Sequence, residues 1–144
     1  MHHAHDLEGK GDRAAAFKAG QGDAAQVDGS VINISSIVRS NPAQMSVVYS
    51  ATKSALDSIT RGLSRELGPR KMRVNSINAG LTETEGVHGI TGFLDGSEAR
   101  QMVANTPLGR TGQPEDIAPA VVFLASDESA WITDESIRVS GGLQ

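Results

Sequence analysis

The chain has 144 residues and a net charge of −4, and apolar and aromatic residues make up 38% and 3% of it. This length corresponds to one domain, whose core must be mainly aliphatic. The acidic balance, without any basic stripe, excludes nucleic acid as an expected partner. The absence of cysteine excludes disulfides and thiolate metal sites and leads us to expect a cytoplasmic protein.

The sequence predicts neither a membrane segment nor a metal site. The longest apolar run, residues 117–125, is far shorter than the ~20 residues that cross a bilayer. The first residues contain no apolar signal core. His2, His3 and His5 fit either a weak metal site or a terminus without one, and we expect no metal there.

Residues 1–28 differ in composition from residues 29–144, and we interpret them as an atypical N-terminal segment. Asp12 to Ala19 predicts a short helix that ends at Gly20. Residues 9–14 fit the pattern G-x-G-x-x-A of a dinucleotide-binding turn. No hydrophobic strand precedes them, so we interpret them as a glycine-rich lead-in and not as a phosphate site.

From Ser30 onward the hydrophobic pattern alternates between strands and helices. The predicted strands are Ser30–Ser35, Met72–Ile77 and Ser136–Val139, and the predicted helices are Ser46–Leu67, Ser97–Asn105 and Pro114–Ala125. This order implies parallel strands joined by right-handed crossovers. The fold class is therefore α/β, with a partial Rossmann-like, doubly wound parallel sheet of about three to four strands and flanking helices.

The first of these strands raises a question about its edge. Val31, Ile32 and Ile34 would lie on an edge strand with unpaired backbone groups, which is an aggregation hazard unless it is covered. Either the N-terminal segment folds over this edge or another chain does.

Three polar residues form a candidate reaction centre. Tyr49 and Lys53 are four residues apart, and Ser36 ends the strand thirteen residues before Tyr49. Side chains at i and i+4 share one helix face, so the lysine charge would stabilise the phenolate and lower the tyrosine pKa from about 10. A serine hydroxyl nearby could donate to a substrate oxygen, which completes an acid–base centre. The alternative is that Tyr49 caps the core and Lys53 is a solvated helix lysine.

Further sequence blocks occur in a characteristic order after this centre: Arg73–Gly80, Leu108–Ala118, Phe123–Asp127 and Val139–Gly142. Together with the Ser, Tyr, Lys set they resemble the short-chain dehydrogenases/reductases from about Gly29 to the end. The resemblance implies an oxidoreductase that transfers hydride with NAD(P)(H) to or from a small carbonyl or alcohol substrate, such as a 3-oxoacyl thioester, a sugar or a simple alcohol.

The resemblance also assigns roles to residues. Ser36 would position the substrate, Tyr49 would be the acid–base residue, and Lys53 would lower the tyrosine pKa and hold the nicotinamide ribose. The backbone around Gly80 and Leu81 and the hydroxyl of Thr84 would face the nicotinamide amide and the phosphates. Cofactor-binding residues are thus Tyr49, Lys53, Gly80, Leu81 and Thr84, and residues 85–95 would form a substrate lid.

The helix predicted over residues 46–67 carries a stripe of small residues: Ala51, Ser54, Ala55, Ser58 and Gly62. A second stripe at helical spacing is apolar: Leu56, Ile59, Leu63 and Leu67. The small stripe suits close packing of two helices, as in the four-helix dimer interface of the family, or packing against the chain's own sheet. We expect a homo-oligomer formed through helix 46–67 and the last strand.

The chain departs from the family at several points. The opening strand, glycine-rich turn and helix that cradle the cofactor pyrophosphate are missing, so we interpret the chain as a truncated member and expect no NAD(P)H affinity in the micromolar range. Ala79 replaces the proline of a Pro-Gly turn, and Asp134 stands where glycine is usual. The alternative to an impaired oxidoreductase is a non-catalytic remnant that acts as an oligomerising or binding module.

Overall fold

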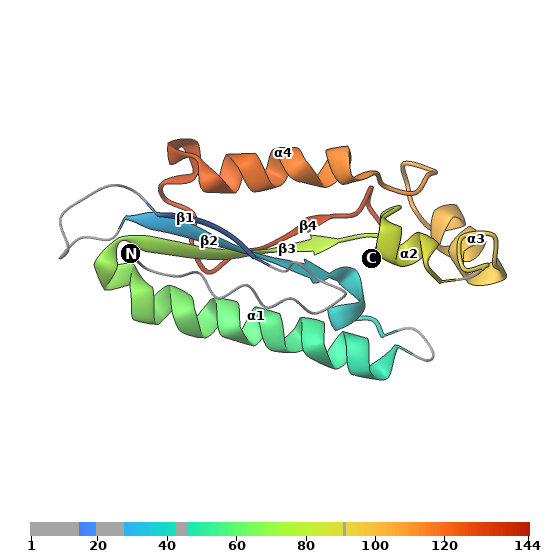
Figure 1. Cartoon of the computed structure of the whole chain (residues 1–144), viewed down its shortest axis with the longest axis horizontal. Coiled ribbons are helices and arrows are strands. Elements are labelled where there is room, and N and C mark those ends of the chain that lie inside the picture. The colour runs from blue at the N-terminus through green and yellow to red at the C-terminus, as the bar shows by residue number, and fades with distance from the viewer. Residues whose placement is uncertain (1–14, 20–27, 43–45, 91) are drawn as a thin grey trace.

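The computed structural model describes residues 15–19, 28–42, 46–90 and 92–144 and has two layers of helix around one sheet (Figure 1). The strands are β1 (Ala15–Ala19), β2 (Gly29–Ser36), β3 (Met72–Ala79) and β4 (Ser136–Val139). The α-helices are α1 (Val47–Leu67), α2 (Glu85–His88), α3 (Ser97–Ala104) and α4 (Pro114–Ala125). Single 3-10 turns are η1 (Ile37–Arg39), η2 (Gly68–Arg70) and η3 (Asp127–Ser129).

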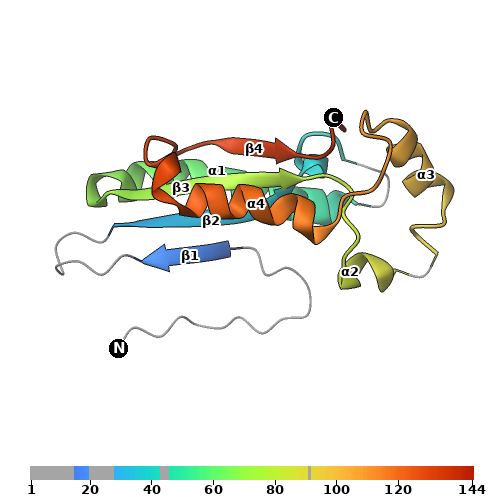
Figure 2. The same ribbon diagram turned by 90° about the horizontal axis from the view of Figure 1, so that it is seen from above.

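The sheet has the strand order β1-β2-β3-β4 (Figure 2). Strands β2, β3 and β4 are parallel, as the sequence predicted, and α1 and α4 connect them on opposite faces of the sheet. The predicted boundaries of α4 and β4 are confirmed, and β2, β3, α1 and α3 agree to within two residues. No helix of the described ranges is long and apolar enough to cross a bilayer.

The structure of β1 contradicts the helix predicted over residues 12–19 and shows what covers the edge of β2. The predicted helix over Asp12–Ala19 is wrong for Ala15–Ala19, which pair antiparallel with β2 from Ala15↔Asn33 to Ala19↔Gly29. Alanine has the highest helix propensity, but tertiary contacts override propensity, and the unpaired backbone groups of the β2 edge offer hydrogen bonds to this segment. Ala15–Ala19 of the N-terminal segment therefore cover the edge of β2.

The face of the sheet under α4 holds the apolar core. Ile32, Ile77 and Leu124 are fully buried there, and α4 completes the cluster from above. Arg73 fastens the end of α4, because its guanidinium donates to the carbonyl oxygens of Leu124 at 2.8 Å and Ser126 at 3.0 Å. This face fixes how α4, and the loop that precedes it, sit over the carboxyl ends of the strands.

The contact between α1 and the sheet contains several buried polar side chains. The buried residues of α1 are Ser50, Lys53, Asp57, Thr60 and Ser64. They bond to the sheet: Asn33 donates to Thr60 Oγ1 at 2.9 Å, and Ser35 Oγ donates to the Lys53 carbonyl at 3.1 Å. Directional hydrogen bonds therefore link this helix to its sheet, beside the buried Val74, which shares this face of β3 with Ser76.

The small-residue stripe of α1 does not pack against the chain's own sheet. Ala51, Ala55, Ser58 and Gly62 are exposed, whereas Ser54 is half-buried and donates to the Arg39 carbonyl. The apolar Ile59 beside them is 48% exposed. Of the two interpretations of this stripe, packing on the chain's own sheet is wrong. The stripe is left on the outer surface of α1.

Candidate active site

The carboxyl ends of the parallel strands meet at one edge of the molecule, where parallel α/β sheets bind their ligands. Ser36 ends β2, Ala79 ends β3 directly beside it, and Val139 ends β4. The first turn of α1 reaches this edge from below, and α2 and α3 lie beyond it (Figure 1). The predicted site residues belong to these strand ends and to the segments that follow them.

Ser36 lies at the turn from β2 into η1. Its Oγ accepts a hydrogen bond from the Val38 backbone N–H at 3.3 Å and so caps η1. The serine is 9% exposed. Because the oxygen acts as acceptor in this bond, the hydroxyl proton stays available for donation to a second oxygen.

Tyr49 and Lys53 come together as their spacing predicted. The Lys53 Nζ lies 5.4 Å from the centre of the Tyr49 ring and donates to the Ile34 carbonyl at 3.0 Å. Lys53 is 3% exposed and Tyr49 is 43% exposed. The alternative of a solvated helix lysine is therefore wrong, since the ammonium is buried between β2 and the tyrosine ring.

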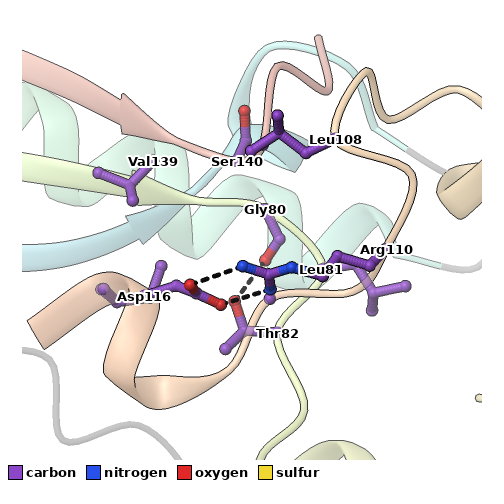
Figure 3. A pocket seen from close by; sticks show the side chains of 11 residues that line it. Gly80, Leu81, Thr82, Leu108, Arg110, Asp116, Val139 and Ser140 are labelled. Carbon is purple, nitrogen blue, oxygen red and sulfur yellow. Dashed lines mark hydrogen bonds and ion pairs between the residues drawn. The ribbon is translucent and has the colours of Figure 1, made fainter.

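Gly80 and Leu81 continue from β3 into a loop that lines a cavity of about 170 Å³. Gly80 N donates to the Val139 carbonyl at 3.0 Å. A Cβ on Gly80 would stand 2.8 Å from the Ser140 Cα, so only glycine fits where the two chain segments approach (Figure 3). The other cavity residues are Thr82, Leu108, Arg110, Gly112, Asp116, Ile117, Val139, Ser140 and Gly141.

Thr84 caps a helix and does not line this cavity. Its Oγ1 accepts from the Val87 N–H at 3.3 Å and caps α2, and the residue is exposed. It is not among the cavity residues. The structure therefore brings Ser36, Tyr49 and Lys53 to the ends of β2 and α1, places Gly80 and Leu81 on the cavity, and leaves Thr84 at the start of the proposed lid.

Sequence reasoning missed the contacts at the start of α4, in the segment that lines the same cavity as the Gly80 loop. Arg110 forms two hydrogen bonds with the Asp116 carboxylate, at 2.6 and 2.8 Å, and these contacts flank the start of α4 (Figure 3). The Arg110 guanidinium, and then the Gln113 N–H, hold the pKa of the Asp116 carboxyl well below its usual range. The only signal in the sequence was an acidic residue in the first turn of a helix, which predicted no partner.

A second set of contacts joins the same two loops. Gly112 N donates to the Leu81 carbonyl at 2.8 Å, and Glu83 N donates to the Gly112 carbonyl at 2.9 Å. The Thr111 hydroxyl donates to the Glu83 carboxylate, and this bond, followed by that of Gln113, lowers the Glu83 pKa. The loop that the resemblance assigns to the nicotinamide is thus anchored to the start of α4.

The two departures from the family pattern have different outcomes. Asp134 adopts a left-handed conformation with φ of 66°, which glycine adopts more easily than aspartate. Ala79 instead ends β3 in regular pairing with Ser36, so the replaced proline leaves the strand intact. No group of three or more His, Asp or Glu in the part of the chain that the structure describes could hold a metal ion.

Parallel strands covered by helices on both faces, with candidate polar residues at their carboxyl edge, define a Rossmann-like α/β protein. A family model described as enoyl-(acyl carrier protein) reductase matches residues 3–144. The chain belongs to the short-chain dehydrogenase/reductase family.

The similar proteins are of several kinds. An uncharacterized oxidoreductase of Methylorubrum extorquens is 49% identical over 133 residues, which are 92% of this chain and 50% of that protein. The 3-oxoacyl-[acyl-carrier-protein] reductase of Chlamydia trachomatis is 40% identical over 117 residues, 80% of this chain and 45% of that enzyme. A putative 2-deoxy-d-gluconate 3-dehydrogenase from Agrobacterium tumefaciens, solved with bound NADP, is 28% identical with a TM-score of 0.73, covering 81% of this chain and 46% of that one. The chain spans about half the length of the curated relatives it matches.

Proposed function

We propose that this chain carries the proton-transfer half of an NAD(P)-dependent oxidoreductase that acts on a small carbonyl or alcohol substrate. The observation that carries the proposal is the buried Lys53 ammonium, held by the Ile34 carbonyl beside the Tyr49 ring. A lysine is rarely buried, because desolvation of its charge is costly unless the ammonium is paired or hydrogen-bonded.

The chemistry follows from the three side chains. In the reducing direction, a bound reduced nicotinamide would supply the hydride to the carbonyl carbon. The Tyr49 hydroxyl gives its proton to the carbonyl oxygen, and the Lys53 charge favours the phenolate that remains. The Ser36 hydroxyl donates a hydrogen bond to the same oxygen while its own oxygen accepts from Val38.

The described residues fit the half of the cofactor that contains the nicotinamide and its ribose. The glycine at position 80 allows the close backbone approach that a nicotinamide amide needs, and Lys53 and Tyr49 could hold the adjoining ribose. The described segments contain no strand, glycine-rich turn and helix that would bind a pyrophosphate. We therefore propose that the activity of this chain alone is impaired.

The substrate class follows the relatives. A 3-oxoacyl thioester, a sugar or a simple alcohol would each present the carbonyl or hydroxyl that the Ser, Tyr, Lys set handles. The residues of the lid would select among them. The lack of cysteine in the chain supports action in a reducing compartment, the cytoplasm.

The test is a turnover measurement at high protein concentration with NADPH and acetoacetyl-coenzyme A, in which the absorbance of the reduced nicotinamide is monitored. We expect slow turnover that Tyr49→Phe abolishes, because the phenyl ring has no proton to donate. Ser58→Ala, an exposed change on the same helix, is the matched control and retains turnover. Equal rates in the parent and Tyr49→Phe would refute the proposed role of Tyr49.

A second candidate function is an oligomerising module, and the surface of α1 favours it. Val48 is 79% exposed and Ile59 48% exposed, next to the small-residue stripe. Such a face suits the close approach of a second α1 in a symmetric dimer. Sedimentation should show a dimer that Ile59→Glu dissociates and Val122→Glu, on the exposed face of α4, leaves intact. A monomeric parent chain would refute this function.

A further inference from the structure

We propose that Asp57 is a positioning residue that, with Arg39 and Ser76, fixes helix α1 against the sheet so that Lys53 stays between Ile34 and Tyr49. The proposal rests on the proposed function, because it concerns how the acid–base pair is held in place. Neither Asp57 nor Arg39 was singled out from the sequence.

Asp57 is a buried carboxylate with two partners on two other elements. It is 2% exposed. Its Oδ1 accepts from the Ser76 hydroxyl of β3 at 3.0 Å, and its Oδ2 lies 2.8 Å from Arg39 Nε. The Nε–H is not aligned with Oδ2 for a hydrogen bond, so this contact is an ion pair held by charge.

Arg39 ties the segment after Ser36 to α1 at a second point. Its carbonyl accepts from the Ser54 hydroxyl at 2.9 Å, one residue after Lys53. Arg39 closes η1, the turn that Ser36 caps through the Val38 N–H. The turn that carries Ser36 is therefore attached to the helix that carries Tyr49 and Lys53 through both the backbone and the side chain of Arg39.

These contacts matter because the sheet-facing side of α1 is polar. Apolar side chains that interlock would set the position of a helix by shape, whereas the buried residues of α1 are Ser50, Lys53, Asp57, Thr60 and Ser64. Asp57 lies one helical turn after Lys53 and is the acidic member of this set. A buried carboxylate that loses its cation is strongly destabilising, so the pair holds the helix in one register.

Tyr49 is the only tyrosine of the chain, so its ionisation can be followed directly by ultraviolet absorbance. If α1 moves, Lys53 leaves the Ile34 carbonyl and its charge is screened by water, which raises the Tyr49 pKa. Loss of the Asp57 charge alone would act in the opposite direction, because a removed negative charge favours the phenolate. The sign of the change therefore separates positioning from simple electrostatics.

The variants are Asp57→Asn and the neutral pair Arg39→Met/Asp57→Asn, with Lys53→Met as benchmark and Glu66→Gln, on the exposed side of α1, as control. We expect both Asp57 variants to raise the Tyr49 pKa by about 0.5 or more, in the direction of Lys53→Met, and the control to leave it unchanged. An unchanged or lowered pKa in folded Asp57→Asn, or an unchanged pKa in the neutral pair, would overturn the proposal.

Folding is checked by circular dichroism before each titration. Should the Asp57 variants not fold, Ser76→Ala keeps the ion pair and removes only the tie to β3. It should then raise the Tyr49 pKa by a smaller amount, and no rise would equally overturn the proposal. If Lys53→Met itself leaves the pKa unchanged, the proposed function of the Tyr49–Lys53 pair fails, which is a separate result.

Discussion

Lys53 places its ammonium 5.4 Å from the centre of the Tyr49 ring while 97% of the residue is buried, as its 3% exposed fraction shows. The position of this charge beside the ring, and not in solvent, is what the proposed reaction centre requires. The Ile34 carbonyl holds it there.

Lys53→Met separates the electrostatic role of this residue from its packing. The methionine side chain fills a similar volume without a buried charge, so we expect the free energy of unfolding to change by no more than about 1 kcal/mol. The Tyr49 absorbance titration should nevertheless move to higher pH, whereas Arg61→Met on the exposed side of α1 should not move it. A titration that coincides with that of the parent would show that Lys53 does not act on Tyr49.

Glycines at two positions of the chain should respond oppositely to alanine. Gly80→Ala places a Cβ 2.8 Å from Ser140 Cα, and the resulting displacement should destabilise the fold by about 1–3 kcal/mol. Gly62→Ala, exposed in α1 with no atom within 4 Å of the new Cβ, should stabilise it by about 0.5–1 kcal/mol. Urea unfolding measures both, and a destabilised Gly62→Ala would indicate that the stripe is already in contact with another helix.

The left-handed residue before β4 offers a stabilising change. Asp134 has φ of 66°, and its 4.0 Å contact with Arg65 is exposed and worth little. Asp134→Gly should therefore raise the free energy of unfolding by about 0.5–1 kcal/mol, and Asp134→Ala should lower it. The thermal midpoints of the two variants should lie on opposite sides of the parent, and midpoints on the same side would contradict this account of the strain.

The contacts of Asp116 and Glu83 near the Gly80 loop should weaken in acid. The pKa values of Asp116 and Glu83 are lowered in the folded chain, so the stabilisation they give is present above their unfolded pKa values of about 4 and is lost as pH falls below that. Asp116→Asn/Glu83→Gln should therefore reduce the dependence of the urea midpoint on pH between about pH 5 and 2. If the urea midpoint of this variant falls with pH as steeply as that of the parent, other carboxylates are responsible for the loss of stability in acid.

The parallel core could be predicted from the sequence because its signals are local. Short β-branched runs gave β2 and β3, and Pro114 with Asp116 in the first turn gave the start of α4. Because the strands are parallel, their carboxyl ends then placed Ser36 and Gly80 at one edge of the sheet.

The remaining features depend on partners far away in the sequence. Ala15–Ala19 is a strand only because β2 offers it an unpaired edge. Asp57 and Thr60 have the polarity of solvent-facing helix residues, and their burial is decided by Ser76 and Asn33 on the sheet. No spacing rule within α1 could have shown this.

The most direct test of the account is a titration of the purified chain, at a defined oligomeric state, with NADH and NADPH. Binding would be followed by energy transfer from Trp131, the only tryptophan, to the nicotinamide. With the proposed acid–base centre but no pyrophosphate cradle in the described segments, we expect no saturable binding in the micromolar range. Saturable micromolar binding by the folded chain would contradict the account and would mean that the chain, or its oligomer, builds a complete cofactor site.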